Sequence, residues 1–99
     1  MNRNLIMIHG IVSGKVQNVG FRRFVQKTAQ KLNLTGWVRN LDDGKVELVG
    51  VGPKQKIDFF VDTVKKGTIL SRIDSVLISE RKNVSDKTFS SFEIIQTFG

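Results

Sequence analysis

The chain of 99 residues has no cysteine and only one histidine. The lack of cysteine excludes disulfides, thiol catalysis and cysteine-bound metal, and a single histidine cannot form the cluster that a zinc site needs. No apolar run is long enough to span a membrane, and the run near the N-terminus is too short for a signal peptide. These absences predict a cytoplasmic protein that uses no metal and no cofactor and has no membrane partner.

The chain also lacks the Gly-, Ser- or Pro-rich stretches that link domains, and proline occurs once. We therefore expect a single domain over residues 1–99, with one core, acting as a monomer. The net charge is +7, which favours anionic partners. Charge of this sign attracts small anions and nucleic acid alike, so it does not separate an enzyme from a binding module.

Hydrophobic periodicity and turn signals predict an alternation of strands and helices. Strands are expected at residues 5–13, 36–41, 45–51, 73–79 and 89–96, helices at 21–32 and 53–66, and a loop at 80–87. This order predicts an α+β fold, a ferredoxin-like α/β sandwich in which two helices pack on one face of an antiparallel sheet.

Three polar residues could be taken for catalytic groups. Asp42 and Asp43 precede Gly44 between two strand-like runs, and Asp-Gly in that setting is a strong hairpin signal, so we interpret them as turn residues. His9 lies inside the first strand, five residues before the first loop. We interpret it as a partly buried, hydrogen-bonded histidine.

The stretch from Gly14 to Arg22 has the features of an anion cradle. Glycines at 14 and 20 permit backbone angles and close approaches that side chains forbid, and a helix starting near Phe21 directs unsatisfied N–H groups towards the loop. The planar guanidinium of Arg22 can grip two phosphate oxygens at once. Arg23 points about 100° away on the same helix, so only one of the two arginines can face the cradle.

Several segments together resemble the acylphosphatase family. Residues 14–22 match its signature Gly-x-Val-Gln-Gly-Val-Gly-Phe-Arg, which Ala29 extends, and residues 36–47 match its pattern Gly-Trp/Tyr-Val-x-Asn followed by Asp-Gly-x-Val-Glu. Shorter matches lie at residues 71–73 and 92–94. Asn18 replaces a family glycine, and asparagine is the other residue type that best tolerates positive φ.

The resemblance implies metal-independent hydrolysis of the carboxyl-phosphate bond of small acyl phosphates. It also implies roles for particular residues: Arg22 would bind the phosphoryl group and Asn40 would orient the attacking water. The other residues that would hold the phosphoryl oxygens form the loop, namely Lys15, Val16, Gln17, Asn18, Val19 and Gly20. Independently of the resemblance, a cradle without metal ligand, cysteine or positioned histidine suits a leaving group that needs no protonation, and a carboxylate is one.

Two alternatives share some of these features. RNA-recognition domains have the same element order, and Gly20 to Val25 resembles their aromatic RNP1 motif, but here the motif opens a helix, and residues 45–49 of the third strand contain no aromatic residue. We therefore expect no nucleic-acid partner. The other alternative is the acylphosphatase-like module at the start of carbamoyl-transferring maturation factors, against which the length of the chain argues.

Overall fold

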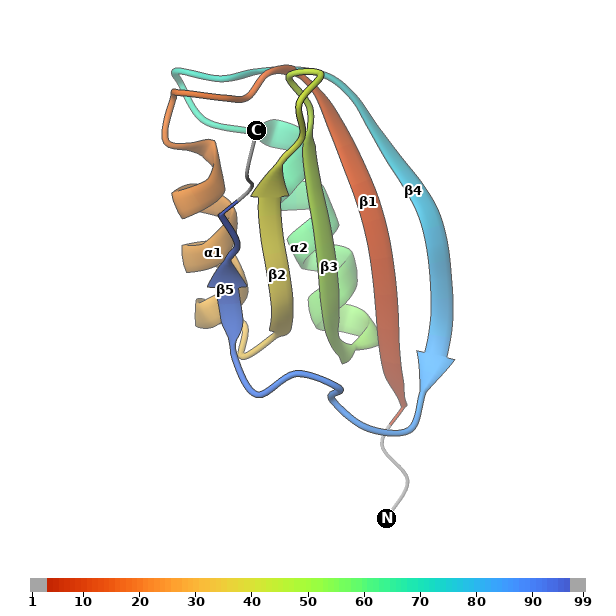
Figure 1. The fold of residues 1–99 in the computed structure, drawn as a ribbon. Helices are drawn as coiled ribbons and strands as arrows, with labels where there is room; N and C mark the ends of the chain where they lie inside the picture. The colour runs from red at the N-terminus through yellow and green to blue at the C-terminus, as the bar shows by residue number, and fades with distance from the viewer. Residues whose placement is uncertain (1–3, 97–99) are drawn as a thin grey trace.

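The computed structural model describes residues 4–96, which form a five-stranded sheet with two helices on one face (Figure 1). The elements follow one another as β1 (Leu5–Lys15), α1 (Phe21–Lys31), β2 (Thr35–Asn40), β3 (Val46–Pro53), α2 (Lys54–Lys66), β4 (Arg72–Val84) and β5 (Phe92–Ile94). This is the predicted ferredoxin-like α+β sandwich. Neither helix of the described part is long and apolar enough to cross a lipid bilayer.

The sheet is mixed, which corrects the prediction of a purely antiparallel one. Its strand order is β4-β1-β3-β2-β5, and the first four strands pair antiparallel, whereas β5 pairs parallel with β2. The reason is visible in Figure 1: after β4 the chain passes below the lower ends of the strands to the opposite edge of the sheet and then runs upward beside β2. It then runs in the direction of β2, so a parallel pair is the only one that it can form.

The boundaries of the last two strands also differ from the predicted ones. The expected loop at residues 80–87 is strand as far as Val84, because residues 80–84 continue to pair with β1. The expected strand at 89–96 shrinks to Phe92–Ile94. An edge strand such as β4 tolerates charged residues in any order, so its polar end gives no periodic signal.

The core lies between the sheet and the two helices. From α1 it takes Phe21, Val25 and Ala29, and from α2 it takes Ile57, Phe60 and Val64, all at most 1% exposed and spaced as an apolar helical stripe. The facing sheet residues include Ile8, Val12, Val38, Val46 and Leu48. The core therefore anchors β1, α1 and β2, whose ends meet at the candidate site.

Candidate active site

The loop from residue 16 to residue 20 joins the end of β1 to the start of α1. Val16 is 1% exposed and Val19 packs against the core, whereas Asn18 and Gly20 are exposed. The apolar members thus hold the loop on the core. The polar and small members are left to face outward.

Positive backbone angles shape the loop where the sequence predicts them. Gly14 has φ of 134°, and a Cβ there would lie 2.0 Å from the carbonyl oxygen of Arg72, so no larger residue fits. Gly20 has φ of 75° and Asn18 has φ of 62°. The family glycine that Asn18 replaces therefore stands at a left-handed position, which asparagine tolerates.

The N-terminus of α1 presents unsatisfied donors at the loop. Its N-cap, Gly20, provides no side-chain hydrogen bond, and the first turn contains no acidic residue. The free N–H groups and the partial positive charge of the helix end are thus neither capped nor neutralised locally. This end of the helix is suited to an anion.

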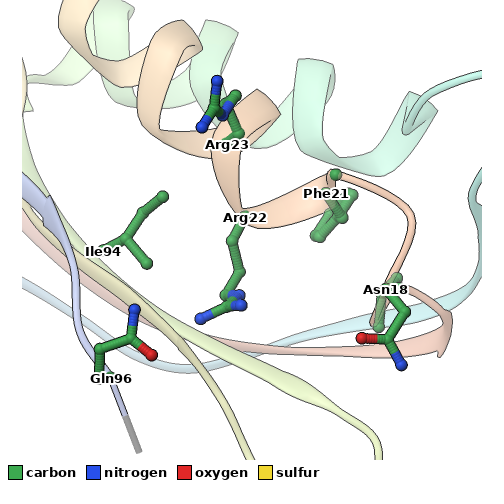
Figure 2. A pocket seen from close by; sticks show the side chains of 8 residues that line it. Asn18, Phe21, Arg22, Arg23, Ile94 and Gln96 are labelled. Atoms are coloured by element: carbon green, nitrogen blue, oxygen red, sulfur yellow. The ribbon is translucent and has the colours of Figure 1, made fainter.

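A cavity of about 300 Å³ opens beside this helix end. Figure 2 shows Arg22 extending from α1 into the space between Asn18 and Gln96, whereas Arg23 leaves the helix in a different direction. Only Arg22 therefore faces the cradle, as expected for adjacent residues on a helix. The lining comprises Val16, Asn18, Gly20, Phe21, Arg22, Arg23, Ile94 and Gln96.

The guanidinium of Arg22 is available to a ligand. Within residues 4–96, Arg39, Arg72 and Arg81 each form an ion pair with a carboxylate, and Arg22 forms none. Its side chain is only partly exposed. A planar cation held at the mouth of a helix end without a counterion is well placed to bind a phosphoryl group.

Asn40 lies at the end of β2, on the sheet face that the helices cover. It pairs with Val46 in β3 and shares the face of Val38, and both valines belong to the core. Asn40 does not line the cavity described above. Its side-chain Oδ1 is nevertheless buried and accepts no hydrogen bond from any group in residues 4–96, which is uncommon for a buried polar atom.

The remaining predicted phosphate-binding residues divide into two groups. Those that line the cavity are Val16, Asn18, Gly20 and Arg22. Lys15 and Val19 do not, because Lys15 still pairs with Arg72 in the sheet and the side chain of Val19 packs on the core. Their N–H groups belong to the loop, but their side chains point elsewhere.

Gln17 has a role that the sequence did not reveal. Its Nε2 donates hydrogen bonds to the carbonyl oxygens of Leu41, at 2.8 Å, and Lys45, at 2.9 Å. Both carbonyls belong to the turn that directly follows Asn40. The Gln17 side chain therefore joins the loop of residues 16–20 to the hairpin that carries Asn40, a contact between segments that no local pattern records.

Replacing Gln17 by methionine should lower kcat/KM about 30-fold, since two hydrogen bonds of about 1 kcal/mol each would no longer hold the loop to the hairpin. Steady-state kinetics on an acyl phosphate measure this. Gln30→Met is the matched control, because the Gln30 amide also donates to a backbone carbonyl, that of Phe92, on another part of the sheet. Equal losses in both variants would contradict the role of Gln17.

Replacing Asn18 by glycine should leave activity unchanged or raised, whereas valine should nearly abolish it, because a β-branched residue resists positive φ. Asn33 also has positive φ, at 56°, but lies at the other end of α1. Asn33→Val should therefore lower the melting temperature and leave kcat/KM unchanged. An active Asn18→Val enzyme would show that the loop does not depend on this angle.

The other polar candidates are structural, as interpreted. Asp43 accepts a hydrogen bond from the backbone N–H of Lys45, at 3.1 Å, within the hairpin turn. His9 lies on the open face of the sheet, where its Nδ1 contacts Ser79 and its Nε2 lies 2.6 Å from Glu47 Oε2. Within residues 4–96, no three side chains of the kinds that bind metals gather into a site.

Glu47 joins His9 to Arg39 across three strands. Arg39 Nε donates to Glu47 Oε1 at 2.6 Å. Partial burial alone would raise the pKa of Glu47, but hydrogen bonds from His9 and Arg39 outweigh it, and the pKa lies below its usual value. This row of charges stabilises the face of the sheet that no helix covers and does not reach the cavity.

These features define a class: a ferredoxin-like α+β sandwich with an arginine-flanked anion cradle between its first strand and first helix. A family model described as Acylphosphatase matches residues 8–94. An acylphosphatase of Syntrophotalea carbinolica is 45% identical over 83 residues, covering 84% of this chain and 88% of that protein. The chain belongs to the acylphosphatase family, whose activity is the hydrolysis of acyl phosphates.

Solved structures agree with this assignment. An acylphosphatase from Coxiella burnetii superposes with a TM-score of 0.81 at 37% identity, over 93% of this chain and 94% of that one. HypF from T. kodakarensis matches with a TM-score of 0.74 at 36% identity, over 94% of this chain but 12% of that one. The fold therefore also occurs as one part of a larger protein. An acylphosphatase-like module of a larger protein is the second alternative that the sequence analysis considered.

The RNA-binding alternative finds no support in the structure. Phe21 is 1% exposed, and Phe24 packs against the core with its ring centroid 5.9 Å from that of Phe21. Residues 46–53 of β3 contain no aromatic side chain. Within residues 4–96, neither β1 nor β3, the strands at the centre of the sheet order, thus offers a phenylalanine, tyrosine or tryptophan side chain of the kind on which such domains stack bases.

Proposed function

We propose that this acylphosphatase-family enzyme binds the phosphoryl group in the loop of residues 15–20 with Arg22, and that Asn40 orients the water that attacks it. The observation that carries the proposal is the direction of Arg22, which enters a cavity at the uncapped end of α1 without an ion-pair partner in residues 4–96. Backbone N–H groups and a guanidinium are the donors that phosphoryl oxygens require.

For the phosphoryl group, the two kinds of donor act differently. The N–H groups of the loop and helix end are fixed by the backbone, so they need no reorganisation as charge develops. The guanidinium of Arg22 adds a full charge and a bidentate grip. Together they would hold the oxygens in ground state and transition state alike.

For the water, Asn40 offers a buried acceptor, Oδ1, and the amide donors. A carboxamide fixes a water in position but does not deprotonate it, so no general base is involved. The oxygen of the water bonds to phosphorus as the bond from phosphorus to the bridging oxygen breaks. The electron pair leaves with the carboxylate, and the proton of the water passes to a phosphate oxygen.

The leaving group explains why so few groups suffice. A carboxylate is a weak base and departs at neutral pH without a proton. An alkoxide from an ordinary phosphomonoester would need a general acid, and among residues 4–96 no histidine, aspartate or glutamate lines the cavity. The proposed substrates are therefore small acyl phosphates and not phosphomonoesters.

Release of phosphate from benzoyl phosphate, measured beside an alkyl phosphomonoester and in excess chelator, tests this proposal. We expect hydrolysis of the acyl phosphate to continue in chelator and the phosphomonoester to remain intact. Arg22→Ala, prepared in the same way, controls for contaminating phosphatases. Activity lost in chelator would contradict the metal-independent mechanism, and tight, salt-sensitive RNA binding without phosphate release would contradict the function.

For the setting of the enzyme, we propose a monomer in the cytoplasm that acts on small molecules and binds no nucleic acid. For the location, the support is the lack of cysteine in the sequence. Size-exclusion chromatography with light scattering tests the monomer.

A further inference from the structure

The cavity is larger than the group that the cradle would hold. Its volume of about 300 Å³ lies at the lower end of the range of about 300–1,000 Å³ that small-molecule sites have. A phosphoryl group, with one phosphorus and three terminal oxygens, fills only part of it. The remainder adjoins the phosphoryl group and is therefore available to the acyl part of the substrate, which one bridging oxygen joins to the phosphorus.

Besides residues of the loop and the start of α1, the lining of the cavity includes Arg23 on α1 and Ile94 and Gln96 at the end of the chain that the structure describes. Ile94 pairs with Val38 at the end of β5, and Gln96 follows two residues later in the chain. Figure 2 shows the Gln96 amide turned towards the space that Arg22 enters. The guanidinium of Arg23 and the amide of Gln96 flank the aliphatic side chain of Ile94 (Figure 2). This polar lining suits a short polar acyl group better than a long apolar one.

Arg23 cannot share the phosphoryl group with Arg22. The two residues are adjacent on a helix and diverge by about 100°, and Figure 2 shows their side chains leaving in different directions. Arg23 is exposed and forms no ion pair within residues 4–96. Its long stem lets the guanidinium reach a group that extends from the mouth of the cavity.

We propose that Arg23, with Gln96 opposite, forms a subsite for the acyl group, and that it favours acyl groups that carry a carboxylate remote from the reacting phosphate. The inference rests on the proposed function, since it assumes that the phosphoryl group occupies the cradle. Arg23 is a specificity residue in this scheme. It contacts the distal carboxylate and takes no part in the transfer to water.

Three rigid substrates separate charge from size: benzoyl phosphate, 4-carbamoylbenzoyl phosphate and 4-carboxybenzoyl phosphate. The last two have nearly the same shape and differ in one negative charge, and the para position prevents cyclisation. The measured quantity is the ratio of kcat/KM for the carboxy substrate to that for the carbamoyl substrate. We expect Arg23→Gln to lower this ratio about fivefold, the effect of one partly exposed ion pair.

Lys27→Gln is the matched control. Lys27 lies one turn further along the same exposed face of α1, does not line the cavity, and its replacement changes the net charge equally. We expect it to leave the ratio unchanged. A Gln96→Ala variant should lower kcat/KM for both para-substituted substrates by a larger factor than for benzoyl phosphate, which reports on the Gln96 side of the subsite.

The outcomes separate the inference from the proposed function. If the unmodified enzyme hydrolyses no benzoyl phosphate, the proposed function fails. If it hydrolyses all three substrates and Arg23→Gln keeps the ratio, or Lys27→Gln lowers it equally, the subsite is overturned and the function stands. Circular dichroism confirms that each variant is folded.

Discussion

Replacing Arg22 by alanine is expected to lower kcat/KM on the order of 10³-fold, with phosphate affinity falling at least about tenfold. The physical reason is that the guanidinium grips phosphoryl oxygens in substrate, transition state and product alike. Arg22→Lys should recover little, because an ammonium is a point charge without the planar fork. Steady-state kinetics and calorimetric titration of inorganic phosphate measure the two effects.

Lys27→Ala is the control for charge, since it removes one positive charge from the next turn of α1, outside the cavity. It should leave both quantities nearly unchanged. An Arg22→Ala protein that is folded by circular dichroism and still binds phosphate as tightly as the unmodified enzyme would show that the guanidinium is not the phosphoryl ligand. The assignment would then pass to the backbone N–H groups alone.

Replacing Asn40 by alanine is expected to lower kcat on the order of 10²-fold or more while KM and phosphate affinity change little. The amide is assigned to the attacking water only, so its loss should affect the chemical step and spare the binding of the phosphoryl group. Asn40→Asp should be equally inactive, because a carboxylate keeps the acceptor but lacks the donor and repels the phosphoryl oxygens. Steady-state kinetics and calorimetric titration of inorganic phosphate measure these effects as well.

Arg39 provides the control for the end of β2. It precedes Asn40 but points to the open face of the sheet, where it pairs with Glu47. Arg39→Gln should keep turnover even if it lowers the melting temperature. Should Asn40→Ala instead keep its turnover and lose phosphate affinity, the water-positioning role would have to be given up.

The contrast between these two residues follows from their positions. Arg22 enters the cavity directly, whereas Asn40 lies outside its lining with a buried, unpartnered Oδ1 on the helix-covered face of the sheet. Gln17 connects the two parts through the hairpin turn. Substitution of Gln17 should therefore moderately weaken both phosphoryl binding and the positioning of the water, and should abolish neither.

The sequence predicted the elements whose cause is local. Helical spacing of apolar residues located α1 and α2, Asp43 and Gly44 located the hairpin, and Gly67, at φ of 67°, ends α2 as expected. The cradle was predicted as well, because glycines, the helix start and Arg22 lie within nine residues of the chain, from 14 to 22. Each of these signals depends on steric or hydrogen-bond preferences within a few residues.

What the sequence could not predict depends on segments that are distant in the chain. The direction of β5 follows from where residues 85–91 cross the sheet, and the extent of β4 follows from its pairing with β1, so neither appears in periodicity. The two hydrogen bonds of Gln17 cross 24 and 28 residues. Gln96, the last described residue, and Arg23, in the first helix, line the same cavity although they are far apart in the sequence.

By itself, therefore, the sequence determined where a loop with positive φ angles leads into a helix with free N–H donors, since φ preferences and helix-end donors are properties of short stretches. Only the tertiary structure decided how Gln96 and Arg23 come to line one cavity and what holds the loop to the hairpin. Those arrangements depend on the packing of the core and on the register of the sheet. Both bring together residues that are distant in the sequence, so neither can be recognised from a short stretch of it.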